Sequence, residues 1–183
     1  MKNFIKTLLS TILISLLADG VVALTSSLYF AKPGIPLGQV ILMNANTLAQ
    51  ANTNPNQGGQ VRLINGWATP ENWGVWSTQS PATLSLPKPK GTPQRLILNV
   101  RALVNTKHPT QLVNILIAGK PRTQITLTQE DHNTIAIPVS NADFEDRQLT
   151  ITLELPNLIS PAALGIGQDQ RPLAIGLKSF EFQ

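Results

Sequence analysis

The chain has 183 residues, of which 13% are charged and 5% aromatic, with a formal net charge of +4 and no cysteine. This length suits one domain plus a short additional segment. The cations are sparse and do not cluster beside aromatic side chains, which argues against nucleic-acid binding. Without cysteine, disulfides and thiol nucleophiles are excluded, so the hydrophobic core alone must hold the fold.

Residues 1–26 form a hydrophobic leader. Two lysines precede an apolar run over residues 7–18, and small residues up to Ala23 follow it. This order is typical of a cleaved signal peptide, which we favour. The alternative is an uncleaved anchor over residues 5–30, but that would place Asp19 near the middle of the bilayer, where a carboxylate is unfavourable. Both interpretations predict an exported domain, periplasmic or on the outer face of the inner membrane.

Two segments beyond the leader look irregular. Residues 44–59 are rich in Asn, Gln and Thr and end in two glycines. We therefore expect an Asn/Gln-rich insertion that forms a surface loop, and whose deletion changes stability little because loop closure depends only weakly on length. Residues 87–93 contain three prolines and a glycine, which indicate a turn.

Most of the remaining chain alternates between apolar and polar residues. A period of two is typical of strands with one buried face. The pattern predicts an all-β fold, a two-sheet antiparallel sandwich resembling a jelly roll, with an up-and-down barrel as the alternative. A short helical turn over residues 160–164, capped by Ser160, is the helix that we expect past the leader. The expected core includes Leu98, Val100, Ile115, Ile137, Ile151, Leu153 and Ile175.

The last strand changes its parity. Its apolar residues are Leu173, Ile175, Leu177, Phe180 and Phe182, so the positions switch from odd to even at residues 178–179. A β-bulge at the switch would keep all five side chains on the core face.

Two segments, residues 66–77 and 160–173, are dense in residues that could carry function. The candidate ligand-binding or structural residues are Trp67, Glu71, Trp73, Trp76, Asp169 and Arg171. In a binding interpretation, the tryptophans stack on sugar rings and the charged residues hydrogen-bond hydroxyls or a phosphate. In a structural interpretation, which we favour, two tryptophans fill one end of the sandwich, and Glu71 and Arg171 form a buried, bidentate ion pair that joins the two segments.

The spacing of the tryptophans supports the structural interpretation. Trp73 and Trp76 are three residues apart, so on a strand they would face opposite sides and could not form one flat platform. Gly66 and Gly74 are better explained by the demands of the backbone than by chemistry.

Residues 66–77, the alternating strands and residues 160–173 together resemble a β-sandwich domain of unknown function, found in or beside bacterial envelope phosphoglycerol transferases and membrane glycosyltransferases. Residues 28–36 resemble its opening strand and turn, so the resemblance covers about residues 27–183. Residues 44–59 are a departure from it. The resemblance implies a non-catalytic fold like that of carbohydrate modules, in a glycan-handling setting, and supplies no binding residues to transfer.

The sequence offers no recognisable catalytic or metal-binding pattern. His108 and His132 are the only histidines, and both lie beside turns, as does the acidic pair Glu130 and Asp131, which we expect to be solvated. There is no serine-hydrolase elbow and no zinc-ligand spacing. We therefore expect no enzyme activity, no metal and no cofactor.

Two functions remain open from the sequence. The first is an exported accessory domain, associated with envelope glycan or glycolipid synthesis, that binds carbohydrate. The alternative is a structural or protein-interaction domain that docks on a membrane-bound envelope partner. Expected partners are envelope polysaccharide or a membrane glycosyl- or phosphoglycerol transferase, without nucleic acid. Membrane contact is expected only through the leader, if it is uncleaved. Exposed aromatic side chains on one face would favour carbohydrate binding. An exposed aliphatic patch or an unpaired edge strand would favour docking on a partner.

Overall fold

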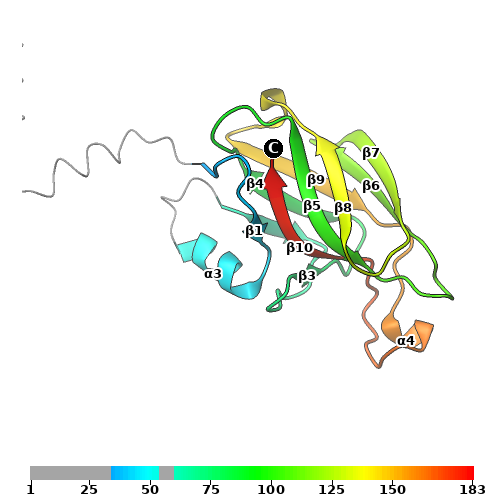
Figure 1. Ribbon diagram of the computed structural model, residues 1–183. Coiled ribbons are helices and arrows are strands. Elements are labelled where there is room, and N and C mark those ends of the chain that lie inside the picture. Colours follow the sequence, from blue (N-terminus) through cyan, green and yellow to red (C-terminus); the bar gives the residue numbers. More distant parts are fainter. Residues whose placement is uncertain (1–33, 54–59) are drawn as a thin grey trace, which may run out of the picture. The chain divides into compact units, whose positions relative to one another are not determined.

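The computed structural model describes residues 34–53 and 60–183, which form an all-β sandwich of two antiparallel sheets (Figure 1). Residues 33–183 make one compact unit. The predicted leader lies outside the described residues. Within the described part of the chain, no helix is long and apolar enough to cross a membrane.

The sheet nearer the viewer in Figure 1, here called the front sheet, has the order β1-β10-β5-β8, and β3 also pairs with β10. Its strands are β1 (Ile41–Leu42), β3 (Val75–Trp76), β5 (Arg95–Ala102), β8 (Asn133–Pro138) and β10 (Ile175–Phe182). The back sheet has the order β2-β4-β9-β6-β7. Its strands are β2 (Arg62–Asn65), β4 (Ala82–Pro87), β6 (Gln111–Ile117), β7 (Lys120–Leu127) and β9 (Gln148–Glu154).

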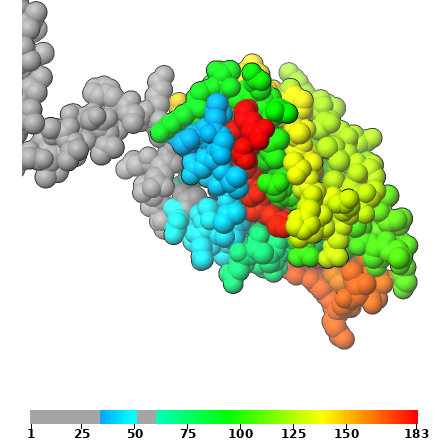
Figure 2. All heavy atoms as spheres, in the orientation of Figure 1, coloured from blue at the N-terminus to red at the C-terminus, as the bar shows by residue number. Residues whose placement is uncertain are grey.

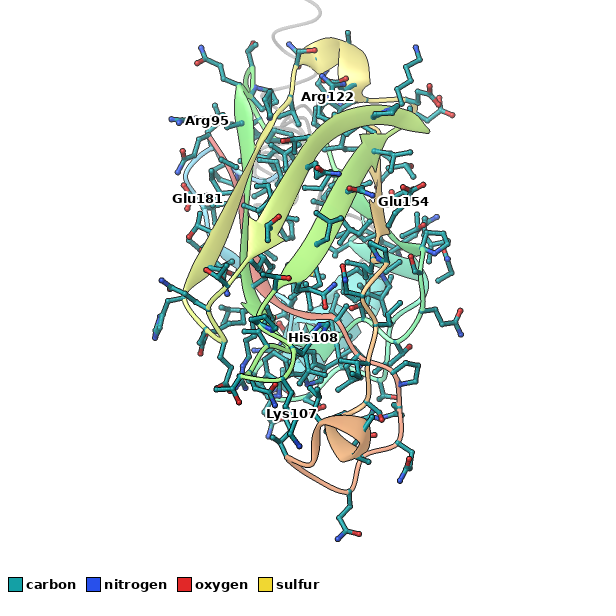
Figure 3. All side chains as sticks on the ribbon, turned by 90° about the vertical axis from the view of Figure 1, so that its right-hand side faces the viewer. Arg95, Lys107, His108, Arg122, Glu154 and Glu181 are labelled. Atoms are coloured by element: carbon teal, nitrogen blue, oxygen red, sulfur yellow. The ribbon has the colours of Figure 1, made fainter. Side chains whose placement is uncertain are left out.

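The core lies between the two sheets because successive side chains of each strand point to opposite faces. All seven predicted core residues are at most 1% exposed, which confirms the sandwich and its buried faces. A side view places Arg95 and Glu181 of the front sheet on one side of the sandwich and Glu154 of the back sheet on the other (Figure 3).

The predicted bulge in β10 is present. The pairing of β10 with β5 shifts register between Leu177 and Ser179. As a result, Leu177, Phe180 and Phe182 are all fully buried although their parity differs.

Residues 44–59 do not form the predicted loop throughout. Helix α3 (Ala45–Thr53) occupies most of the segment, and the side chain of Asn44 accepts a hydrogen bond from the backbone N–H of Thr47 at 2.9 Å. Leu48 is 7% exposed and belongs to the main core. Because the segment is mostly polar, its composition did not indicate that Leu48 would pack in the core. Deleting residues 44–59 would therefore remove core packing, and we now expect a loss of about 2 kcal/mol or more.

The one helix that was predicted past the leader is confirmed. Helix α4 (Pro161–Leu164) begins after Ser160, whose hydroxyl accepts the N–H of Ala163 at 3.2 Å, and it ends at Gly165 with a φ of 74°. A 3-10 turn, η1 (Asn141–Asp143), follows β8.

Candidate functional site

Two of the three tryptophans lie together on the outer face of the front sheet. The ring centroids of Trp73 and Trp76 are 5.4 Å apart, with the planes at 69°. The prediction that they face opposite sides was wrong, because Trp73 lies in a bend before the two-residue strand β3. Gly74 makes this bend possible: its φ is 155°, and a side chain there would begin 2.4 Å from the carbonyl oxygen of Leu177.

The two indole rings lie over Gly176 of β10. A Cβ at Gly176 would lie 2.5 Å from Cη2 of Trp73 and 3.3 Å from Cε3 of Trp76, so a glycine is needed for the rings to approach the sheet. Gly176 pairs with Trp76 on one side and with Arg101 of β5 on the other. The Arg101 guanidinium carbon lies 5.3 Å from the Trp73 centroid and 5.9 Å from the Trp76 centroid, a cation–π arrangement.

The turn between β7 and β8 supplies two carboxylates to this face. Glu130 accepts a hydrogen bond from Arg101 at 2.9 Å, and Asp131 accepts one from Lys178 at 2.9 Å. The hydrogen bond from Lys178 holds the pKa of Asp131 below its ordinary value. The acidic turn, which we expected to be only solvated, therefore forms two ion pairs with the front sheet.

A polar row crosses the same face next to the tryptophans. Asn99 of β5 donates to Ser179 of β10 at 3.0 Å and accepts from Thr134 of β8 at 3.3 Å. An open cavity of about 230 Å³ lies here; its lining includes Asn99, Asp131, His132, Thr134 and Lys178. Neighbouring outward positions on a strand are about 7 Å apart, so the cavity adjoins Arg101.

We call the set of Trp73, Trp76, Arg101, Asn99, Lys178 and Asp131 the front-face site. It combines two half-buried aromatic rings, paired charges and amide and hydroxyl groups on one surface of regular strands. Figure 2 shows this outer face, with the segment that carries β3 at one end of β10. Such a combination can stack on a sugar ring and hydrogen-bond its hydroxyls.

Trp67 lies outside the front-face site and stabilises the fold. Its indole N–H donates to the carbonyl of Thr83 at 2.9 Å, and its ring packs against the main core. The preceding Gly66 has a φ of 80°, and a Cβ there would lie 2.6 Å from the carbonyl oxygen of Pro81. The backbone therefore requires glycine at Gly66 and Gly74, as expected.

The predicted ion pair between Glu71 and Arg171 is not formed. Arg171 instead pairs with Asp169, two residues earlier in the same loop, through contacts of 2.6 and 3.0 Å. Glu71 accepts a hydrogen bond from the indole N–H of Trp73 at 2.9 Å. Both Glu71 and Arg171 are exposed. The pairing was wrong because each group finds a partner within its own segment, at lower entropic cost than a contact across the sandwich.

The electrostatics of this loop follow the local pairing. The hydrogen bonds from Arg171 lower the pKa of Asp169. In turn, the hydrogen bond to Asp169 raises the pKa of Arg171, and the charge of Glu71 adds to this effect. The two sequence segments also meet through apolar contacts: Trp76 packs against a small cluster of Leu103, Leu164 and Leu173.

Sequence reasoning missed the residues that come from β5, β8 and β10. Arg101 and Asn99 occupy outward positions of β5 two residues apart, which the alternation could have placed on one face. Their neighbours Lys178 and Thr134 depend on strand order and register, and alternation carries no information on these.

A second cavity lies at the edge strand β2. It has a volume of about 700 Å³; its lining includes Leu48, Val61, Arg62, Leu63, Ile64 and Pro70. Its lining, which also includes Ser85 and Thr150, offers no aromatic ring. No group of three or more His, Asp or Glu side chains in residues 34–53 and 60–183 could hold a metal ion.

Among solved structures, the chain is similar to a family 35 carbohydrate binding module from Clostridium thermocellum, with 6% identity over 78% of this chain and 98% of that chain, and a TM-score of 0.42. A carbohydrate-binding module, CBM36, in complex with calcium and xylotriose has 15% identity, coverage of 69% and 90%, and a TM-score of 0.36. A family two carbohydrate esterase from Clostridium thermocellum, in complex with cellohexaose, has 9% identity over 67% of this chain, and a TM-score of 0.40.

The chain spans 31% of the length of that esterase. All three TM-scores are below 0.5. No curated protein matches the chain in sequence. The model of one family, described as a domain of unknown function (DUF7024), matches residues 44–183, and the chain belongs to this family.

Proposed function

We propose that the protein is a non-catalytic, exported domain of the bacterial cell envelope that binds carbohydrate through the front-face site. The observation that carries the proposal is the stack of Trp73, Trp76 and Arg101 on the outer face of the front sheet. These rings remain half-buried rather than buried, so part of each is available to a ligand.

The hydrogen-bonding groups beside the rings support a polyhydroxylated ligand. Asn99, Thr134 and Ser179 form a row of amide and hydroxyl groups, and the cavity beside them is open to solvent. Ion pairs with the adjacent carboxylates Glu130 and Asp131 hold Arg101 and Lys178 in place beside the row. Groups fixed in this way lose little conformational entropy when they bind a ligand.

A binding role suits the carboxylates of this region better than catalysis. Asp131 and Asp169 each accept hydrogen bonds from a cation, which lowers their pKa. A general acid at neutral pH needs a raised pKa instead. We therefore assign these carboxylates the role of positioning Lys178 and Arg171.

The cellular setting follows from the leader and from the resemblance described above. Residues 1–26 have the order of basic, apolar and small residues expected of an export signal. We propose that the domain acts beside envelope polysaccharide or a membrane glycosyl- or phosphoglycerol transferase, in glycan or glycolipid synthesis.

A glycan array with the full chain tests this function. The array should contain bacterial envelope polysaccharides and their oligosaccharides, with signal expected for at least one acidic or neutral glycan. Trp73→Ala should remove that signal, and the matched variant Trp67→Phe, on the tryptophan that packs against the core, should retain it. Equal binding by the protein and the Trp73→Ala variant, or no signal across the array, would refute the assignment.

The alternative function, docking on a membrane-bound partner, is favoured by a different surface. Leu37, Val40 and Leu42 are 40%, 49% and 52% exposed and lie on or beside the edge strand β1. This surface does not include the tryptophans, so docking and carbohydrate binding are compatible in one molecule.

A further inference from the structure

The segment over residues 37–42 breaks the alternation that the other strands obey. Outward positions elsewhere are mostly polar, such as Asn99 and Arg101 in β5 or Thr150 and Thr152 in β9. Around β1, Ile41 packs against the core, whereas the outward residues are Val40 and Leu42. Of the five strongly exposed large aliphatic side chains in the described residues, three lie in this segment: Leu37, Val40 and Leu42.

The segment is held firmly while it exposes these side chains. Gly38 donates to the carbonyl of Phe182 at 2.8 Å, and Met43 donates to that of Lys178 at 2.8 Å. Met43 itself is fully buried. The three exposed aliphatic side chains therefore lie on a hydrogen-bonded backbone within one six-residue segment, and exposed apolar groups gathered in this way point to an interaction surface.

Cations border the aliphatic surface on the side of residues 88–91. The N–H of Lys90 donates to Ile35 at 2.8 Å, and Leu37 lies against Gly91. Lys90 is exposed, and Lys88 is partly exposed. Lys88 and Lys90 therefore place positive charge on this side of the aliphatic groups.

We propose that Leu37, Val40 and Leu42 contact the surface of a lipid bilayer, with Lys88 and Lys90 beside the lipid phosphates. Aliphatic groups with adjacent lysines are the pattern of interfacial membrane contact.

The proposal does not depend on carbohydrate binding, but it sets the position of the front-face site. Leu42 pairs with Ser179 and Trp76 pairs with Gly176, three residues apart on β10. That separation is about 10 Å along the strand. A domain held at the bilayer by residues 37–42 would present its tryptophans to glycans attached to the same membrane.

Site-specific quenching in liposomes tests the contact, because the chain has no cysteine of its own. The full chain with Val40→Cys, labelled with an environment-sensitive fluorophore, is reconstituted in phosphatidylethanolamine–phosphatidylglycerol vesicles that contain a headgroup-nitroxide lipid. Ile166→Cys is the matched control: it is 54% exposed and follows α4, at the end of the sandwich where Figure 3 shows Lys107. We expect at least a twofold stronger quenching at position 40 than at position 166.

Two further measurements separate the possible occupants. Lys88→Gln combined with Lys90→Gln should reduce quenching at position 40 in phosphatidylglycerol vesicles and have a smaller effect in phosphatidylcholine vesicles. Equal quenching at positions 40 and 166 would overturn the proposal. Protection of the position-40 label without lipid, together with a doubled molecular mass, would also overturn the proposal. In that case a second copy of the chain would cover the segment. Protection that requires an added envelope protein instead of lipid would overturn it as well.

Discussion

The two sheets of the sandwich share one construction rule but present different outer faces. On the back sheet, the outward side chains include hydrogen-bonded threonines and amides: Thr83 lies 3.5 Å from Thr152 between hydroxyl oxygens, and Gln124 donates to Asn114 at 2.7 Å. On the front sheet, the corresponding surface carries two tryptophans, Arg101 and two ion pairs. Neither outer face is free of aliphatic groups, since Ile64 of β2 is 55% exposed, but residues 37–42 expose three such side chains in one short segment.

The comparison of the two outer faces shows which outward side chains the fold itself requires. The strands of the back sheet contain no aromatic residue, so this sandwich can cover the outer face of a sheet without large rings. Large rings over Gly176 are not required for that purpose, and they demand a glycine in a strand interior, where glycine is unfavourable. The front face therefore carries features that the fold does not require and that the proposed binding function would explain.

The largest effect is expected from adding a side chain beneath the rings. In Gly176→Val, the new Cβ would lie 2.5 Å from Cη2 of Trp73, and the branched side chain would add further overlap. Overpacking of this kind destabilises by about 1–3 kcal/mol and should displace both rings. Thr152→Val, the matched change on the back face, should alter the free energy of unfolding by less than about 0.5 kcal/mol. Thermal unfolding and near-ultraviolet circular dichroism measure both; equal, small effects would mean that the rings are not seated on Gly176.

A somewhat smaller effect, confined to binding, is expected from Trp73→Ala. Loss of a central aromatic contact weakens binding by about 2 kcal/mol, or about thirtyfold in Kd. Gln124→Ala on the back face should leave Kd unchanged. Calorimetry with the strongest glycan from the array checks both variants, and a comparable loss in Gln124→Ala would show that the two faces do not differ in function.

The smallest effect concerns the ion pairs and pH. The folded-state pKa of Asp131 is lowered, first by the hydrogen bond from Lys178. Its contribution to stability is therefore present above its unfolded pKa of about 3.9 and is lost as pH falls through the lower folded value. The melting temperature should stay nearly constant from about pH 7 to 5 and decline below about pH 4.

Variants at the two faces sharpen the pH prediction. Asp131→Asn should flatten part of the acid decline, because the carboxylate that titrates is gone. Glu154→Gln is the back-face counterpart, since Glu154 has no ion-pair partner within the described residues. It should leave the decline unchanged. An acid decline of the same slope in Asp131→Asn and the unmodified chain would show that this ion pair does not contribute.

The sequence predicted those features that depend on local pattern. Alternation identified the buried residues, parity located the bulge at residues 178–179, and Ser160 marked the start of α4. Each depends on neighbours within a few residues. Helix α3 was missed because its polar composition resembled a loop, while the contact that fixes it, Leu48 in the core, is a long-range one.

The site was predicted less well than the fold for the same physical reason. The tryptophan segment was found by composition, but the partners of its residues were not. Arg101 reaches the rings only because β5 and β3 flank β10, and Lys178 meets Asp131 across the front sheet. The predicted partner of Arg171 was also wrong, because Asp169 lies nearer to it along the chain than Glu71 and forms the ion pair instead.

The indole N–H signals of the three tryptophans test the central claim most directly. In a ¹⁵N–¹H NMR titration of the protein with the strongest glycan from the array, each tryptophan gives one indole signal, and Trp67 serves as an internal reference because it donates to Thr83 beside the core. The account predicts that the signals of Trp73 and Trp76 shift in a saturable manner while that of Trp67 stays in place. A shift of Trp67 alone, or the absence of any shift at saturating glycan, would contradict it.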